Sequence, residues 1–314
     1  MSTFFALLDL TAPLFMLIGA GYVLTRSGRW PLVAADALTR FVFSIAIPML
    51  LFRLMSDFAR EPRVDARLLV AFFGGCFIVY AIGRLAAFAI FRMDGAAQSV
   101  FAMGGIFANN VLLGVPLAKV TLGEAALPAV SLILVFNSLV LWTLATVSVE
   151  WARHRDFSPT GLVRTLVGVI RNPIVASILI GTAFGFTGLM LPSFVDQTLV
   201  LVSQAAIPLS LIALGMGLAG FGVKSSWGIS GAIAFAKLVL HPLAVYLLAR
   251  ALDLPALETA AVVMLAALPI GANVYLMSRQ FDVLTGPVAS GIVLTTVLAA
   301  LTTPLVLTLC RAPL

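Results

Sequence analysis

Apolar segments of membrane-spanning length follow one another along almost the whole chain. A helix that crosses the hydrocarbon core of a bilayer needs about 20 mainly apolar residues. Charged or Pro/Gly-rich stretches separate ten such segments, at residues 4–25, 32–55, 66–91, 97–118, 126–150, 173–190, 197–220, 227–250, 256–278 and 285–309. The pattern predicts an all-α integral membrane protein with ten transmembrane helices.

The amino-acid composition agrees with this pattern and indicates which partners the protein has. Of the 314 residues, 61% are apolar and 10% are charged, whereas a soluble domain carries roughly 25% charged residues. Mean hydropathy is +1.13. The net charge of +6 is typical of basic loops beside a membrane and does not indicate nucleic-acid binding. We therefore expect the lipid bilayer as a partner and no nucleic acid.

Short motifs recur in the two halves of the chain at a nearly constant separation. The matched pairs are Asp36 with Asp196 and Pro48 with Pro208, both 160 residues apart, and Asn110 with Asn273, 163 residues apart. Matches in corresponding segments indicate an internal duplication. The longest polar interval divides the segments into five plus five, so each half has an odd number of helices and the second copy is inverted in the membrane.

This duplication defines the expected organisation of the chain. We predict a first five-helix repeat at residues 1–153, a cytoplasmic linker at 154–172 and a second five-helix repeat at 173–314. Inverted repeats whose segments are interrupted by Gly and Pro at matching places are typical of secondary transporters, and the interruptions mark the substrate site.

Basic residues predict the orientation of the chain, because cytoplasmic loops carry an excess of Lys and Arg. The loops after odd-numbered segments hold nine of them: Arg26, Arg29, Arg92, Arg153, Arg155, Arg164, Arg171, Lys224 and Arg279. The other loops and the C-terminus hold six: Arg60, Arg63, Arg67, Lys119, Arg250 and Arg311. We expect a multi-pass protein of the inner (plasma) membrane with both termini outside.

The fourth and ninth segments contain the strongest helix-breaking signals. The fourth has Asn109, Asn110, Gly114 and Pro116, and the ninth has Pro269, Gly271 and Asn273. Non-helical backbone at membrane depth survives only where protein buries it or a wet cavity adjoins it. Two such breaks that cross would offer free N–H groups and positive dipole ends to an anion. The alternative is interhelical hydrogen bonding by asparagine beside an ordinary proline kink.

Lys237 lies near the centre of the eighth segment, with His241 one helical turn later. A central Lys costs about 2.5–3.5 kcal/mol on insertion scales, so it needs a partner or a cavity. We favour a structural role, in which Lys237 neutralises the negative C-terminal ends of helices at the crossing. The alternatives are pairing with an anionic substrate and a proton relay through His241.

Three further polar side chains stand inside apolar segments and are candidates for the substrate site: Ser44, Gln204 and Asn137. Ser44 lies one turn before Pro48, and Gln204 lies one turn before Pro208. Serine near a proline often bonds only to its own helix, which is the alternative interpretation for Ser44. Asn137 is costlier to bury, and we expect it to face the cavity.

Other motifs limit the chemistry. The sequence has no CxxC, P-loop, HExxH or GxSxG, so we expect no metal site, no nucleotide and no enzyme. Gly215-x-Gly217-x-x-Gly220 lacks the βαβ context of a dinucleotide site, and small-residue helix packing explains it better. Gly181-x-x-x-Gly185 is a helix-packing motif that leaves a homodimer open.

The strings "GIFANNVLLGVPL" and "AALPIGANVYLMSRQF" resemble the auxin efflux carrier family, most of all its bacterial, malonate-transporter-like members. The resemblance covers nearly the whole chain and implies the fold of bile-acid/sodium symporters and sodium/proton antiporters. In that fold a panel domain, here segments 1, 2, 6 and 7, carries a moving core domain, here segments 3–5 and 8–10. The resemblance also implies that Asn110, Pro116, Pro269 and Asn273 line the substrate site, with Asn109 adjacent.

These inferences together predict a secondary transporter of small organic anions that works by elevator-type alternating access. Mono- or dicarboxylates such as malonate are the expected substrates, and the resemblance leaves auxin-like acids open. The main alternative is a proton- or sodium-coupled carrier or exchanger of the same fold with a different solute. No cofactor is expected beyond a coupling H⁺ or Na⁺. A membrane enzyme or a channel is disfavoured, because only Lys237 and His241 could form a catalytic dyad at depth.

Overall fold

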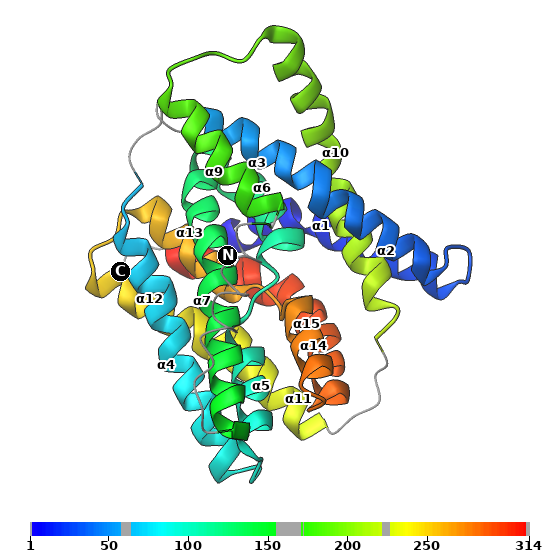
Figure 1. Cartoon of the computed structure of the whole chain (residues 1–314), viewed down its shortest axis with the longest axis vertical. Helices are drawn as coiled ribbons and strands as arrows, with labels where there is room; N and C mark the ends of the chain where they lie inside the picture. Colours follow the sequence, from blue (N-terminus) through cyan, green and yellow to red (C-terminus); the bar gives the residue numbers. More distant parts are fainter. Residues whose placement is uncertain (1, 58–63, 155–170, 172, 222–226, 312–314) are drawn as a thin grey trace.

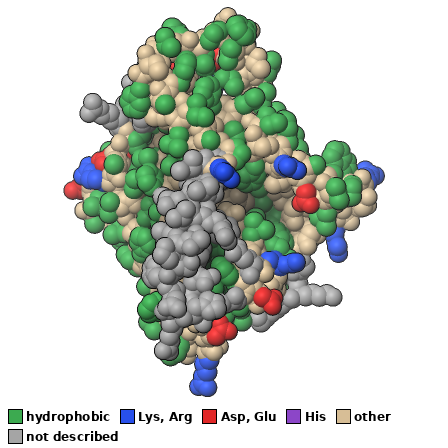
Figure 2. Space-filling model, in the orientation of Figure 1, with side chains coloured by type: hydrophobic (Ala, Val, Ile, Leu, Met, Phe, Trp, Pro, Cys, Tyr) green, Lys and Arg blue, Asp and Glu red, His purple; other side chains and the backbone are tan. Residues whose placement is uncertain are grey.

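The computed structural model describes residues 2–57, 64–154, 171, 173–221 and 227–311, and these residues are helical apart from turns and one isolated β-bridge (Figure 1). Most of the predicted linker 154–172, and Lys224, lie outside the described residues. Within these described ranges, six helices are long and apolar enough to cross a membrane: Phe4–Arg26, Leu32–Ser56, Arg67–Ala89, Ser193–Leu218, Trp227–Ala251 and Thr285–Cys310. On the face shown in Figure 2, hydrophobic side chains cover much of the described surface, and charged side chains are few and scattered.

The helices follow the predicted segments closely. The first half contains α1 (Ser2–Arg26), α2 (Leu32–Phe41), η1 (Val42–Ala46), α3 (Ile47–Ser56), α4 (Arg67–Ala89), α5 (Gly95–Ile106), η3 (Asn110–Gly114), α6 (Val115–Thr121), η4 (Glu124–Ala126) and α7 (Leu127–His154). The second half contains α9 (Pro173–Phe186), α10 (Ser193–Leu218), α11 (Trp227–Phe235), η5 (Ala236–Leu240), α12 (His241–Ala251), α13 (Ala256–Ala267), α14 (Ala272–Gln280) and α15 (Thr285–Arg311).

Helix packing divides these elements into two groups. In the first, α10 packs against α1, α2 and α3, and α9 packs against α3. In the second, α4 packs against α5 and α12, while α13 packs against α12 and α15. The groups meet mainly where α1 contacts α15 and α6, and where α10 contacts η3 (Figure 1).

Glycines allow the helices of the first group to approach closely. A Cβ at Gly215 in α10 would collide with the backbone of Ile18 in α1, and one at Gly21 would collide with the backbone of Ile212. Small-residue packing thus accounts for Gly215, as its sequence context predicted, whereas a Cβ at Gly217 would meet nothing within 4 Å.

The motif Gly181-x-x-x-Gly185 packs within the chain. A Cβ at Gly181 would lie 2.7 Å from the carbonyl oxygen of Phe52, and one at Gly185 would lie 2.8 Å from that of Ser56. Both contacts are with α3. Because α3 of the same chain occupies this face, the motif gives no support to a homodimer.

An ion pair also ties α3 to α10. Arg53 Nε donates to Asp196 Oδ1 at 2.7 Å, and Arg53 Nη2 donates to Asp196 Oδ2 at 3.4 Å. The two-pronged geometry fixes the direction of both side chains. The pair is partly exposed, with 30% of the Arg53 and 39% of the Asp196 side chain accessible, so its contribution to stability is about 0–1 kcal/mol.

Three π-helical turns interrupt the long helices, each just before a proline. They are η1, η3 and η5, and the prolines that follow are Pro48, Pro116 and Pro242 at the start of the next α-helix. Proline removes an N–H donor and displaces the carbonyl of the preceding turn. A wider π turn accommodates this displacement without ending the helix.

Candidate functional site

The two predicted breaks lie against each other in the structure. Ala108 and Ile270 form an antiparallel β-bridge. The N–H of Asn109 donates to the carbonyl oxygen of Pro269 at 2.9 Å, and the N–H of Gly271 donates to that of Phe107 at 2.8 Å. Backbone groups that neither helix can satisfy are therefore satisfied by the other break, as burial in an apolar interior requires.

Four helix ends surround this bridge. Helices α5 and α13 end just before it, at Ile106 and Ala267, and η3 and α14 begin just after it, at Asn110 and Ala272. The first N–H groups of a helix have no intrahelical acceptor, and the N-terminal end of the helix dipole is positive. The region thus combines two ends that favour an anion with two that favour a cation.

Glycines of both breaks pack closely against the opposite break. A Cβ at Gly271 would lie 2.8 Å from the carbonyl oxygen of Ala108, which is the bridging residue of the other break. A Cβ at Gly114 would lie 2.9 Å from Leu268 Cδ1 and 3.0 Å from Leu265 Cδ2. A larger residue at Gly271 would push the two breaks apart, because it would meet backbone, whereas at Gly114 the ends of two leucine side chains would have to shift.

The asparagines of the first break are almost completely buried. Asn109 is 7% exposed, Asn110 is 2% exposed and Asn137, which reaches the site from α7, is 5% exposed. Asn110 Nδ2 donates to Asn137 Oδ1 at 3.3 Å, while Asn110 Oδ1 is buried without a hydrogen-bond partner. Such an atom costs about 1–3 kcal/mol in a folded protein.

The asparagine pair can present either an acceptor or a donor. As it stands, Asn110 offers a free carbonyl oxygen, which suits a cation, a water molecule or a protonated acid. If both amides turn by half a rotation, Asn137 donates to Asn110 and the free atom becomes an N–H₂ group, which suits a carboxylate. On the second break, Asn273 lies half-buried in the first turn of α14.

Lys237 is fully buried and contacts the end of α13. Its Nζ donates to the carbonyl oxygen of Ala266 at 2.5 Å and lies 3.1 Å from His241 Nδ1. Ala266 belongs to the last turn of α13, whose carbonyls lack intrahelical donors. The ammonium group therefore neutralises the negative end of a helix that stops at the break, which is the contact required by the structural interpretation of Lys237.

Two side chains of this region escaped the sequence analysis. Cys76 Sγ of α4 lies 3.3 Å from His241 Nε2, so the chain Cys76–His241–Lys237 crosses three elements. Thr295 Oγ1 of α15 accepts a hydrogen bond from the N–H of Ile270 at 3.1 Å and donates to the carbonyl oxygen of Gly291 at 2.8 Å. A polar Thr295-Thr296 pair inside an apolar segment was the only available signal.

Ser44 and Gln204 lie apart from the buried asparagines. Both are exposed, and Ser44 Oγ donates to the carbonyl oxygen of Arg40 at 2.5 Å. Ser44 thus bonds to its own helix, which was the alternative to a role in the substrate site. Over the described part of the chain, no hydrogen bond joins either side chain to Asn109, Asn110 or Asn137. The described residues likewise hold no cluster of three His, Cys, Asp or Glu side chains that could bind a metal ion.

Comparison with known proteins identifies the class of the molecule. Residues 7–307 match the family described as "Membrane transport protein", and the chain belongs to this family of transporters, which is the auxin efflux carrier family. The resemblance seen in the sequence is therefore confirmed, as is the expectation of a multi-pass membrane transporter rather than an enzyme.

Two relatives match over nearly their full length. The chain is 30% identical over 310 residues to a protein of Rhizobium meliloti (strain 1021) named "Putative malonate transporter", covering 96% of this chain and 95% of the relative. It is 24% identical over 303 residues to an uncharacterized transporter of Methanocaldococcus jannaschii, covering 94% and 96%.

Proposed function

We propose that the protein is a secondary transporter of small organic anions, with malonate and related mono- or dicarboxylates as substrates. This proposal rests on the contact between two interrupted helices. At this contact η3 and α14 begin, and buried asparagines lie beside their N-terminal ends. Free N–H groups and positive dipole ends bind carboxylates without any charged side chain. The name of the Rhizobium relative supports a dicarboxylate as cargo.

The proposed binding site consists of residues from both breaks and from α7. We assign to it Asn109, Asn110, Gly114, Pro116, Asn137, Pro269, Gly271 and Asn273. The two glycines allow the backbones to meet, and the two prolines keep the interruptions open. In this site the asparagines hold the carboxylate, and Lys237 balances charge at the end of α13. Ser44 and Gln204, on the exposed faces of η1 and α10, would join the site only in another conformation.

Elevator-type alternating access accounts for the grouping of the helices. The ten segments form two inverted repeats in this proposal, in an inner membrane with both termini outside. Segments 1, 2, 6 and 7 form the panel, and segments 3–5 and 8–10 form the moving core. Support comes from the packing of α1, α2, α3, α9 and α10 as one group and of the remaining long helices as another. The substrate would travel with the core, because both breaks belong to it.

Transport by purified protein in liposomes tests the proposal. Uptake of labelled malonate is measured for the wild type and for Asn110→Ala and Asn273→Ala, with Thr198→Ala on the exposed surface of α10 as the matched control. Loss of hydrogen bonds to a charged ligand, at about 1.5–3 kcal/mol each, predicts uptake that falls at least about tenfold in both asparagine variants. Undiminished uptake in both would overturn the site assignment, and indole-3-acetate as a competitor tests auxin-like acids.

A coupled carrier or exchanger with a different solute is the second candidate. The unpartnered Asn110 Oδ1 is an oxygen ligand of the kind that binds Na⁺, and the Lys237–His241 contact could pass a proton. Uptake driven by an imposed sodium or pH gradient distinguishes these couplings. If neither gradient changes the rate or the final level of accumulation, the carrier works without a coupling ion.

A further inference from the structure

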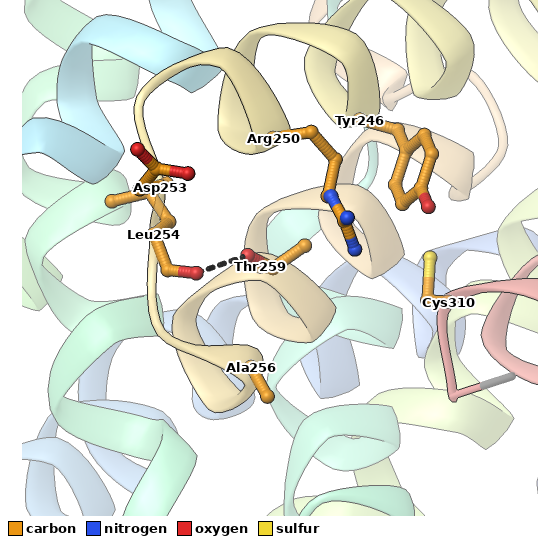
Figure 3. Close-up of a pocket in the computed structure, with 7 residues that line it drawn as sticks. All are labelled: Tyr246, Arg250, Asp253, Leu254, Ala256, Thr259 and Cys310. Carbon is orange, nitrogen blue, oxygen red and sulfur yellow. Dashed lines mark hydrogen bonds between the residues drawn. The ribbon is translucent and has the colours of Figure 1, made fainter. Parts of the chain in front are cut away.

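A pocket outside the proposed transport site lies at the ends of three helices. It has a volume of about 330 Å³ and is lined by Tyr246 and Arg250 of α12, Asp253 and Leu254 of the following turn, Ala256 and Thr259 of α13, and Cys310 of α15. Ligand pockets typically measure about 300–1,000 Å³, so this one suits a small group. Figure 3 shows Arg250 extending between Tyr246 and Thr259, with Cys310 beyond.

The pocket lining holds one basic side chain, Arg250, and one acidic side chain, Asp253. No salt bridge engages Arg250 within the described ranges of the chain. Asp253 is the acidic residue of the lining, and Arg67, whose guanidinium pairs with Asp65 at 2.6 Å, donates from Nη1 to the neighbouring carbonyl oxygen of Leu252 at 2.8 Å. The hydroxyl of Thr259 is engaged with the carbonyl oxygen of Leu254 at 3.2 Å. Among the described residues, the guanidinium of Arg250 and the hydroxyl of Tyr246 have no hydrogen-bond partner that competes with a ligand.

Exposed leucines lie on two of the helices that line the pocket, α12 and α15. Leu243 and Leu247 precede Arg250 by seven and three residues, on one face of α12, and are 50% and 58% exposed. On α15, Leu305 and Leu309 are 49% and 62% exposed, and Leu309 precedes Cys310 in the sequence. In a membrane protein such faces contact acyl chains, and Arg250 at the end of α12 lies where lipid headgroups begin.

We propose that this pocket binds the phosphate of an anionic phospholipid. The guanidinium fork of Arg250 matches two phosphate oxygens, and the Tyr246 hydroxyl supplies a third donor. The acyl chains lie along the leucines of α12 and α15. An arginine at the end of a transmembrane helix can hold an anionic headgroup through charge-assisted hydrogen bonds, and the site is independent of the asparagines assigned to transport.

The thiol of Cys310 reports occupancy directly. It lines the pocket and is partly exposed, whereas Cys76 is 0% exposed, so iodoacetamide labels Cys310 selectively in the folded protein. The labelling rate is measured in nanodiscs of phosphatidylcholine alone and of phosphatidylcholine with phosphatidylglycerol. A ligand at three to nine times its dissociation constant reduces the free site about four- to tenfold, and we expect slowing of that size with phosphatidylglycerol. Equal rates in the two lipids would overturn the proposal.

Variants and a soluble phosphate complete the test. Arg250→Gln should abolish the protection, whereas Arg40→Gln, an exposed arginine outside the pocket, should keep it. Cys310→Ala provides the labelling blank. Glycerol 3-phosphate added to phosphatidylcholine nanodiscs should protect weakly or not at all, because it lacks the chains. Full protection by glycerol 3-phosphate would mean that the ligand is a soluble phosphate ester and not a lipid. Protection by phosphatidylglycerol that persists in Arg250→Gln would mean that membrane surface charge, and not binding in this pocket, slows the labelling.

Discussion

The ammonium group of Lys237 and the main-chain carbonyl oxygen of Ala266 are 2.5 Å apart, at the point where α13 stops. This contact gives a fully buried lysine a neutral partner and gives the last turn of a broken helix its missing donor. An ammonium group and an unpaired helix end are each unfavourable to bury in an apolar interior. The hydrogen bond between them reduces both free-energy costs.

Replacing this lysine should destabilise the fold. In Lys237→Met the carbonyl of Ala266 loses its donor at an apolar depth, a loss of about 1–3 kcal/mol. The thermal unfolding of purified protein in detergent measures the change. Lys119→Met is the matched control, because Lys119 is only partly buried and pairs with Glu124 at 3.0 Å, where about 0–1 kcal/mol is expected. A melting temperature that rises in Lys237→Met would mean that the desolvation of the ammonium outweighs the capping.

The Asn110–Asn137 contact should appear as a coupling between two helices. A double-mutant cycle with Asn110→Ala, Asn137→Ala and the double variant isolates the pair. We expect a coupling free energy of about 0.5–1.5 kcal/mol in unfolding, the range of a single hydrogen bond. Additive effects of the two substitutions would show that the two amides act separately. Repeating the cycle with saturating malonate tests whether substrate engages the same pair.

Two glycines of α10 should respond in opposite ways to one added methyl group. Gly215→Ala places a Cβ against the backbone of Ile18, and overpacking of this kind typically costs about 1–3 kcal/mol. Gly217→Ala adds a Cβ that meets nothing within 4 Å, so helix propensity alone predicts a gain of about 0.5–1 kcal/mol. Thermal unfolding of both variants is the measurement. Equal shifts in the same direction would contradict the close contact of α1 with α10.

The ion pair in the turn before α4 predicts that the stability of the fold decreases slightly at acidic pH. Hydrogen bonds from the Arg67 guanidinium and backbone N–H hold the pKa of Asp65 below its usual value of 3.8. A lowered folded-state pKa means that the stabilisation is present above about pH 3.8 and is lost as the pH falls through the folded value. Asp65→Asn should therefore flatten the decline of the melting temperature below that pH. Asp282→Asn, at another exposed turn, should leave the decline unchanged.

The sequence predicted the positions of the helices because apolar length and helix-breaking residues are local signals. Segment 66–91 became α4, Arg67–Ala89, and the breaks fall where Asn109 and Pro269 stand. Among the described residues, six spans are supported by length and composition. Of the other four segments, 97–118 and 256–278 are interrupted, 173–190 holds the 14-residue α9, and 126–150 holds the 28-residue α7. The inverted arrangement of the repeats remains a proposal.

The details of the candidate site depend on contacts between distant residues and were harder to foresee. Nothing near Cys76 in the sequence indicates that it lies beside His241, 165 residues later. Thr295 resembles any threonine that bonds to its own helix, and only packing brings the N–H of Ile270 to it. The π turns before Pro48 and Pro242 also escaped prediction, because a proline in an apolar helix is compatible with a kink, a break or a wider turn.

The bridge between the two breaks has a consequence for how the family can diverge. Its two hydrogen bonds, from Asn109 to Pro269 and from Gly271 to Phe107, use main-chain atoms alone. Exchanging the amide side chain of Asn109 for that of another residue leaves its donor in place, and only proline would remove it. Side chains around the proposed site can therefore change in polarity and shape while the main-chain hydrogen bonds that hold the two broken helices together stay in place.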